Sequence, residues 1–398
     1  EELDFIVNYT SSDPDYDASV TVSGDVTLAI TVGSALKRAE LISGSETTSL
    51  TFRYVVEEGD IANRGLILGP IELNGGNIKS KNGTAANNTL SGVGSTSAIN
   101  VDAVVPTVVA VTSSAIDGYY TTNAGIVVQV SFPENVTVTG VPVLSLNSGG
   151  VAAYSSGSGT TTLAFTYTVG SGNKSADLDY ANATALSLDG ATIRDAAGND
   201  AILTLPTPGA SNSLGASKAI VIDTEAPQIT IGAPSLASTS GADVTFPITY
   251  ADDNFGASTL KVADITLNTT GTATGSLAVT GTGTTRNVVV SGITGSGTLG
   301  ISIAAGSALD KASNLAAAAG PSTTFRVLST NADLSAIALS AGTLSPEFAA
   351  NTLTYTAPVA YATASVAVTP SVAQAAATVK LKINNGSFVD VTAGQASA

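Results

Sequence analysis

Two short acidic segments contain the residue types that could bind a metal ion. The stretch IRDAAGNDA (193–201) places two carboxylates, an amide and a glycine within nine positions, and a weaker copy, ALDKASNLA, follows at 308–316. The chain has no histidine and no cysteine, so a metal site must use oxygen ligands, which indicates Ca²⁺ or Mg²⁺. The alternative is a structural turn, because Asp and Asn form Asx-turns and Gly198 supplies a positive φ.

Further acidic residues recur along the chain. The segment SSDPDYDAS (11–19) has a DxDxD pattern that resembles the start of a calcium loop without the rest of that motif. Carboxylates a few ångströms apart raise one another's pKa values unless a cation neutralises them. Calcium accepts irregular sets of about six to eight oxygens, so it suits loops better than magnesium does. The candidate ligands are Asp13, Asp15, Asp17, Asp102, Glu134, Asp195, Asn199, Asp223, Asp252, Asp253, Asp310 and Asn314.

The composition excludes several classes of protein. Without histidine and cysteine, Ser-His-Asp and Cys-His nucleophile systems and the usual zinc sites are impossible, and we do not expect an enzyme. The formal net charge of −16 makes nucleic acid an unfavourable partner. No apolar run reaches the roughly 18 residues of a membrane-spanning helix. Only 12% of the residues are charged, which is typical of secreted, repetitive β-proteins.

The elements that position these residues are predicted to be β-strands. Period-two alternation dominates short runs rich in Val, Ile and Thr, such as GIVVQVSF (125–132), TTLAFTYTV (161–169) and RNVVVSGI (286–293). Such runs suit strands with one buried face, and their regular spacing between turn residues indicates β-sandwiches. We therefore predict an all-β fold of tandem sandwich domains in an elongated array.

The chain also contains an internal duplication. SGSETTSLTFRYVVEEGD (43–60) matches SGSGTTTLAFTYTVGSGN (156–173), and IELNGGNIKSKNGTAA (71–86) matches LSLDGATIRDAAGNDA (186–201). The order is preserved at an offset of about 115 residues, which indicates tandem duplication.

Two similar linkers mark the ends of the repeated unit. INVDAVVPTV (99–108) and IVIDTEAPQI (220–229) share an apolar strand, an Asp, a spacer and a Pro that cannot extend a β-ladder. A diverged third copy follows the second linker. The predicted domains are 1–101, 102–222, 223–328 and 331–398; we call the first three module one, module two and module three, and the last the C-terminal segment.

This organisation predicts where the acidic loops meet. In sandwiches of the immunoglobulin type, the loops after the second strand and before the last strand lie at the end where the chain enters. In module two these loops are FPEN (132–135) and DAAGN (195–199), and Asp102 lies in the entering linker, so the three segments should converge. In module one, Ser80 replaces the loop Asp and Lys81 adds a positive charge, which weakens any equivalent site.

Two parts of the chain resemble known families. ADLSAIALSAGTLSPEFAANTLTYTAPV (332–359) resembles the opening of the cadherin-like β-sandwich domain of bacterial surface proteins, over roughly 331–398, with the closing strands missing. The VIDTEAP linker and the DAAGN loop resemble those of bacterial immunoglobulin-like repeats in large adhesins and surface proteins. This resemblance implies junctions between domains that calcium makes rigid.

Module one differs from module two at its start. LDFIVNYT (3–10) matches the second strand run of module two, so module one has no counterpart of TVVAVTSS (107–114). We expect the chain to be cut from a longer array; the alternative is that another copy supplies the strand.

The predicted function is structural. We expect an extracellular segment of a bacterial or archaeal surface protein that acts as a stalk, an adhesin spacer or a matrix element. One alternative is a self-assembling filament or surface-layer subunit joined by strand complementation. Another is a carbohydrate-binding accessory region of a secreted enzyme, with Tyr119 and Tyr120 stacking on a sugar. The expected partners are neighbouring domains or further copies, and a cell-surface or polysaccharide ligand.

Overall fold

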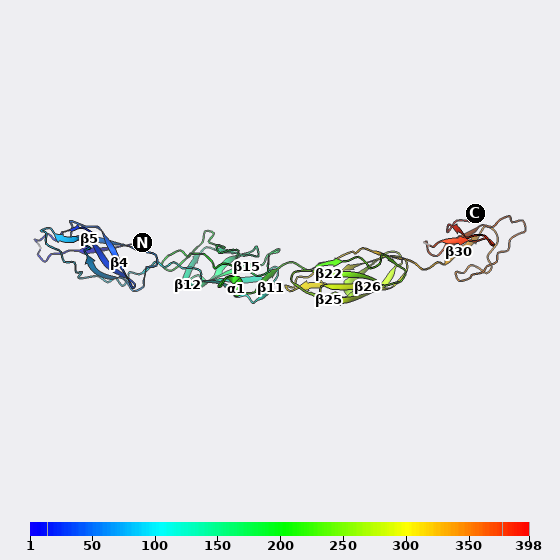
Figure 1. The fold of residues 1–398 in the computed structure, drawn as a ribbon, viewed down its shortest axis with the longest axis horizontal. Coiled ribbons are helices and arrows are strands. Elements are labelled where there is room, and N and C mark those ends of the chain that lie inside the picture. Colours follow the sequence, from blue (N-terminus) through cyan, green and yellow to red (C-terminus); the bar gives the residue numbers. More distant parts are fainter. Residues whose placement is uncertain (14, 376, 398) are drawn as a thin grey trace. The chain divides into compact units, whose positions relative to one another are not determined.

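The computed structural model describes every residue except 14, 376 and 398, and it confirms an all-β, multi-domain fold. In the described part of the chain, the α-helical residues form a single turn, α1 (Leu214–Ser217). The chain forms two compact units, residues 1–224 and 225–398, and strands make up the sheets in each of them (Figure 1).

Module one contains a five-stranded antiparallel sheet in the order β1-β5-β4-β3-β7. Alternate residues of its second strand, β5, face the core, because successive side chains of a strand point to opposite faces. Leu50 and Phe52 are fully buried and Tyr54 is nearly so. The strands are β1 (Glu2–Asn8), β5 (Ser49–Val55), β4 (Ala35–Ser43), β3 (Thr27–Val32) and β7 (Ile67–Glu72), with two small sheets of β2 (Val20–Ser23) and β8 (Asn77–Ser80), and of β6 (Ile61–Ala62) and β9 (Val101–Asp102).

Module two repeats this arrangement with one additional strand. Its main sheet has the order β10-β12-β15-β14-β13-β17, and β18 pairs with the second half of β12. A second sheet has the order β11-β19-β16. The strands are β10 (Ala110–Ser113), β11 (Gly118–Tyr120), β12 (Gly125–Thr139), β13 (Val143–Ser145), β14 (Val151–Ser156), β15 (Thr160–Thr168), β16 (Lys174–Ser175), β17 (Leu186–Ser187), β18 (Thr192–Arg194) and β19 (Ile220–Asp223).

The duplication extends to strand register. Phe5 pairs with Phe52 in module one as Val128 pairs with Phe165 in module two, at the positions that the sequence repeat aligns. β1 therefore corresponds to β12, and β5 to β15. Among the described residues, however, no strand takes the place of β10 beside β1.

Module three has the same strand order in its first sheet, β20-β22-β26-β25. Phe246 and Phe325 are fully buried, and their ring centroids lie 6.1 Å apart. The strands are β20 (Gln228–Ile231), β21 (Ser238–Thr239), β22 (Val244–Ala251), β23 (Phe255–Ser258), β24 (Ile265–Thr269), β25 (Thr274–Thr282), β26 (Thr285–Thr294), β27 (Gly297–Ile303), β28 (Ala308–Asp310) and β29 (Phe325–Val327), with a 3₁₀ turn η1 (Val262–Asp264).

The C-terminal segment contains two two-stranded antiparallel sheets. β30 (Leu334–Leu339) pairs with β31 (Val368–Val372), and β32 (Val379–Leu381) pairs with β33 (Val389–Val391). The three hydrophobic clusters of the described residues lie in the three modules. The immunoglobulin-like and cadherin-like assignments stay predictions.

Two local expectations differ from the structure. The FPEN segment (132–135) is not a loop: it lies inside β12, where the pairing register with β15 shifts between Ser131 and Val136. A β-bulge of this kind re-aims side chains without ending the strand. The helical turn α1 was not predicted; Ser213 caps it by accepting a hydrogen bond from the Ala216 amide, and Leu214 anchors it in the core.

Candidate metal centre

The structure brings three of the candidate ligands together in the first compact unit. Carboxylate oxygens of Asp102, Glu134 and Asp195 all lie within 4.8 Å of one another. Asp195 is buried, with 5% of its surface exposed, and the other two acids are partly buried. The three residues come from β9, from β12 and from the loop after β18, so they converge as the loop order predicts.

The strand pattern of β12 positions Glu134. Phe132 and Val136 are buried on one face of the strand, while Pro133 and Asn135 between them are exposed. Glu134 therefore occupies an inward-facing position by the period-two rule. The bulge between Ser131 and Val136 places this position where β12 leaves β15 and begins to pair with β18.

A tight loop positions Asp195. Its Oδ1 accepts hydrogen bonds from the amides of Gly198 and Asn199, both at 2.8 Å, and its own amide donates to the Asn199 carbonyl at 3.2 Å. Gly198 has φ +99°, a conformation that other residues rarely adopt. The turn that the residue types favoured is therefore present, and it holds one carboxylate of the cluster.

The side-chain nitrogen of Asn199 contacts both the acidic loop and the linker strand. Its Nδ2 donates to Asp195 Oδ2 at 2.7 Å and to the backbone carbonyl of Asp102 at 2.9 Å. The sequence predicted Asn199 as an oxygen ligand. In the structure its amide nitrogen ties the linker strand to the acidic loop, and the role of its oxygen as a ligand stays a prediction.

The electrostatics of the cluster favour a bound cation. Burial raises the pKa of Glu134, and the negative charges of Asp102 and Asp195 raise that pKa further. Arg194, next to Asp195 in sequence, pairs with Asp200 at 2.6 Å. Asp200, next to Asn199 in sequence, is thus engaged in an exposed ion pair.

The donor set suits calcium better than other metals. It consists of carboxylate oxygens, with no sulfur or imidazole, which excludes the preferred environments of zinc and copper. Partly buried acids from three separate segments form an irregular set, which the flexible coordination of Ca²⁺ accepts more readily than the octahedron of Mg²⁺. The residues of the centre therefore fit a calcium ion.

The second compact unit repeats part of this arrangement. Carboxylate oxygens of Asp252 and Asp310 lie within 4.8 Å of each other. Asp310, which is 1% exposed, accepts hydrogen bonds from the Asn314 amide at 2.8 Å and from Asn314 Nδ2 at 2.6 Å. Asn314 thus holds Asp310 as Asn199 holds Asp195. Asp253 is exposed and lies outside this pair.

Asp223 belongs to the first compact unit. It is the last residue of β19, it is 2% exposed, and it pairs in register with Lys174 of β16. Its role as a ligand stays a prediction.

The acids near the N-terminus do not gather into a centre. Asp13, Asp15 and Asp17 are exposed, and none of them is in the acidic groups found among the described residues. Asp17 Oδ2 pairs with Lys81 Nζ at 2.9 Å, and this contact lowers the pKa of Asp17. Lys81, in the module-one loop that corresponds to DAAGN, therefore supplies the positive charge that neutralises Asp17.

A buried acid that the sequence did not single out lies in module one. Asp60 is 6% exposed and accepts hydrogen bonds from the Tyr54 hydroxyl, from the Glu57 amide at 2.9 Å and from Lys37, whose Nζ lies at 3.0 Å. Burial alone would raise its pKa, but these contacts outweigh burial and lower the pKa. The sequence signal was weak, because EEGD (57–60) reads as a charged turn.

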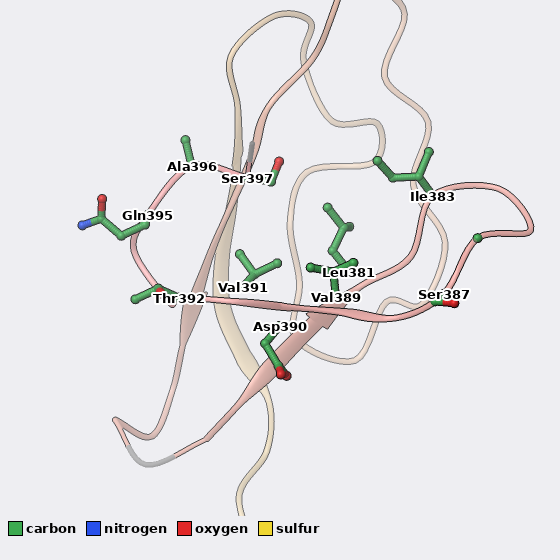
Figure 2. Close-up of a pocket in the computed structure, with 11 residues that line it drawn as sticks. Leu381, Ile383, Ser387, Val389, Asp390, Val391, Thr392, Gln395, Ala396 and Ser397 are labelled. Carbon is green, nitrogen blue, oxygen red and sulfur yellow. The ribbon is translucent and has the colours of Figure 1, made fainter.

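An apolar groove lies in the C-terminal segment, with a volume of about 400 Å³. Figure 2 shows Leu381, Val389 and Val391 on the same side of the β32–β33 hairpin, while Asp390 points away from them. Asp390 is the one carboxylate among the described residues that line this groove, so the groove itself offers no metal centre.

The chain is similar to the structure of surface layer protein SbsC, domains 4–9, at 14% sequence identity with a TM-score of 0.14. The alignment covers 80% of this chain and 41% of that chain, so this chain spans less than half the length of that structure. No protein-family model and no curated protein matches. None of the helices that the structure describes has the length and apolar character needed to cross a membrane.

Proposed function

We propose that the chain is a structural segment of an extracellular surface protein, a stalk, spacer or matrix element, in which calcium makes the connection between module one and module two rigid. The observation that carries this proposal is the double role of β9. Its residue Asp102 pairs in register with Ile61 of β6 in module one. The carboxylate of the same residue lies within 4.8 Å of acids that module two supplies.

Backbone contacts support the mechanical role of this strand. The Ala103 amide donates to the Asp60 carbonyl at 2.8 Å, and the Gly59 amide donates to the Ala103 carbonyl at 2.9 Å, so module one holds the linker up to Ala103. A cation bound by Asp102, Glu134 and Asp195 would hold the same linker to module two. A linker fixed at both of its sides loses the freedom to swivel.

The chemistry of the centre agrees with an extracellular setting. Extracellular calcium modules bind the ion with dissociation constants of about 10⁻⁴ to 10⁻³ M. Such weak binding is sufficient outside the cell, because the calcium concentration there is millimolar. Three carboxylates on separate segments are a modest ligand set of this class. The absence of histidine and cysteine from the sequence and the tandem modules agree with a structural role and not with catalysis.

Calcium titration of the full chain, by calorimetry and by thermal unfolding, tests this proposal. We expect saturable binding in the micromolar to millimolar range, a higher melting temperature with calcium than with chelator, and a smaller effect of magnesium. Small-angle scattering should show a narrower distribution of interatomic distances with calcium. If binding heat, melting temperature and scattering are all unchanged by calcium, the proposal is wrong.

A further inference from the structure

The outer edge of β25, in module three, is an unpaired sheet edge in the interior of the chain. β25 is the last strand in the order β20-β22-β26-β25, and among the described residues it pairs only with β26. By their place in the sheets, its counterparts are β4 in module one and β14 in module two, and these strands pair onward with β3 and with β13. In module three, the preceding strand β24 pairs instead with β27 in the other sheet. The free edge therefore results from the way module three folds.

The pairing of β26 shows which backbone groups of β25 face outward. The Tyr250 amide donates to the Thr284 carbonyl at 2.9 Å on the β22 side. Since alternate residues of an antiparallel strand bond to opposite neighbours, the backbone of Thr285 faces β25. Thr285 pairs with Thr282, so Thr282 and every second residue before it bond to β26. The backbone groups that face the free edge belong to the residues between them, Leu277, Val279 and Gly281.

β25 lacks the features with which proteins usually protect a sheet edge. Edge strands are commonly short, or they carry charges, prolines or bulges. β25 has nine residues, and none of them is charged or a proline. Its pairing with β26 shifts register at its start, between Thr274 and Ser276, and is regular from there on. The inward-facing side chains of Leu277 and Val279 are only partly buried, so an added strand would cover them further.

The surface beside this edge is also free of charge, although the chain has a net charge of −16. The outward-facing side chains of β25 and β26 in the regular part of their pairing are Ser276, Ala278, Thr280, Thr282, Thr285, Asn287, Val289 and Ser291. Two copies of an acidic chain repel each other, so close contact between them is least unfavourable where neither copy carries a charge.

The sequence of β25 reads almost the same in both directions. TGSLAVTGT (274–282) begins with Thr-Gly, ends with Gly-Thr and has Ala278 at its centre, between Leu277 and Val279. Antiparallel pairing of two such strands about a two-fold axis at Ala278 places Leu277 opposite Val279 of the second copy, and Ala278 opposite itself. The edge is therefore complementary to itself, as the interface of a two-fold dimer must be.

We propose that β25 is a self-association site, at which the β25 strands of two copies of this chain pair antiparallel across a two-fold axis at Ala278. Leu277 and Val279 of opposite copies exchange both of their backbone hydrogen bonds, and the two sheets become continuous. On the outer face, Ser276 lies opposite Thr280, a pair of hydroxyl side chains that stabilises neighbouring strands. This proposal concerns the association of copies and does not rest on the proposed calcium site.

Sedimentation of the full chain, with chelator present, tests this proposal over concentrations up to about 1 mM. We expect a reversible equilibrium between monomer and dimer. Ala278→Asp places two negative charges opposite each other at the axis, so it should weaken the dimer at least about tenfold. Ala278→Lys should weaken it for the same reason. An equimolar mixture of the two variants should associate again, because Asp then lies opposite Lys.

The matched control is Thr230→Asp. Thr230 is exposed on β20, the strand at the opposite edge of the same sheet. This variant adds the same charge to module three, and it should dimerise as the original chain does. Ala278 is also exposed, so its variants should retain the circular dichroism spectrum and melting temperature of the original chain.

A cysteine at the axis tests the register directly. The chain has no cysteine of its own, so Ala278→Cys introduces a single thiol. The backbone of Ala278 faces β26, which makes Ala278 and its copy a non-hydrogen-bonded pair, with Cα atoms about 4.5 Å apart. This distance lies within the range of disulfides, about 4.4–6.8 Å. Mild oxidation should therefore link two copies of Ala278→Cys much faster than two copies of Thr230→Cys.

Hydrogen exchange locates the interface at single amides. The amides of Leu277 and Val279 should exchange more slowly as the concentration of the chain rises. Those of Ala278 and Thr280 already bond to β26 and should change much less.

Three results would overturn the proposal. A chain that stays monomeric up to about 1 mM would leave the edge to a different protein. A dimer that Ala278→Asp does not weaken would have its interface elsewhere. Failure of the mixed Asp and Lys variants to associate would show that residue 278 does not meet its own copy. Because chelator is present throughout, these results are separate from those of the calcium titration.

Discussion

Asn199 donates a hydrogen bond from its side-chain amide to the backbone carbonyl of Asp102 at 2.9 Å, across 97 positions of sequence. The same Nδ2 reaches Asp195 Oδ2 at 2.7 Å. One neutral side chain therefore joins the backbone of the linker strand to one carboxylate of the acidic loop.

Replacing Asn199 by Asp should make the first unit depend on calcium. Asn199→Asp removes two hydrogen bonds and adds a fourth carboxylate to the cluster, so we expect a loss of about 1–3 kcal/mol without calcium. Calcium should recover much of this loss, because it neutralises the added charge. Thermal unfolding followed by circular dichroism, with chelator and with calcium, measures both effects. Equal destabilisation in the two conditions would contradict the assigned role.

The matched control for that variant is Asp200→Asn. Asp200 lies next to Asn199 in sequence, but it is exposed and pairs with Arg194. We expect the stability of this variant to respond to calcium as that of the original chain does.

Removing one acid of the centre should abolish the stabilisation by calcium. For the original chain, saturation at roughly 100 times the dissociation constant stabilises the folded state by about 2.7 kcal/mol. Glu134→Gln and Asp195→Asn should each reduce this gain to near zero. Asp15→Asn removes an exposed acid outside the centre and should leave the gain intact. Retention of the full gain in Glu134→Gln would remove that residue from the centre.

Asp60 should make the stability of module one sensitive to acid. Its folded-state pKa lies below the ordinary value of 3.8, so the unfolded state takes up the proton first. The stabilisation is therefore complete above pH 3.8 and is lost as the pH falls through the lower, folded-state pKa. Asp60→Asn should cost about 1.5–3 kcal/mol at neutral pH. The difference in the free energy of unfolding between Asp60→Asn and the original chain should shrink as the solution is acidified below pH 3.8.

Hydrogen exchange of the β5 amides measures this effect, since it reports the opening of module one separately from the rest of the chain. The amides of β15 in module two provide the reference. If Asp60→Asn lowers the stability of module one by the same amount at neutral and at acidic pH, the charge of Asp60 does not carry the stabilisation.

Two leucines at matching positions should respond differently to truncation. Leu214 is fully buried beneath β10, and Leu214→Ala should cost about 2–5 kcal/mol. Leu90 matches Leu214, since residues 88–93 correspond in sequence order to residues 212–217. Leu90 is partly buried, so Leu90→Ala should cost clearly less, because truncating a side chain that is partly exposed to solvent leaves a smaller buried cavity. Hydrogen exchange of β12 and of β1 compares the two variants, and equal losses would contradict the correspondence of the two positions.

Local sequence patterns predicted much of the fold. In GIVVQVSF (125–132) and TTLAFTYTV (161–169), alternate residues proved to be buried, because each residue of a strand faces one side or the other according to its position. The internal repeat predicted two copies of one module, and the registers of β1 with β5 and of β12 with β15 match accordingly. These features depend on near neighbours or on a copied segment, so a single sequence carries them.

The sequence alone determined the oxygen-only chemistry of any metal site, the β-strands, the duplication and the expectation that three acidic segments meet. Only the tertiary structure decided that Asp102, Glu134 and Asp195 approach within 4.8 Å and that FPEN (132–135) is a bulge within a strand. It also decided that Asn199 presents nitrogen to Asp195, and that Asp13, Asp15 and Asp17 belong to none of the acidic groups found among the described residues. The reason is physical: residue type and alternation act over a few positions, whereas a distance between loops depends on how every intervening strand pairs and twists. The shift in pairing register between Ser131 and Val136 of β12 decides where Glu134 lies, and nothing in the local pattern encodes that shift.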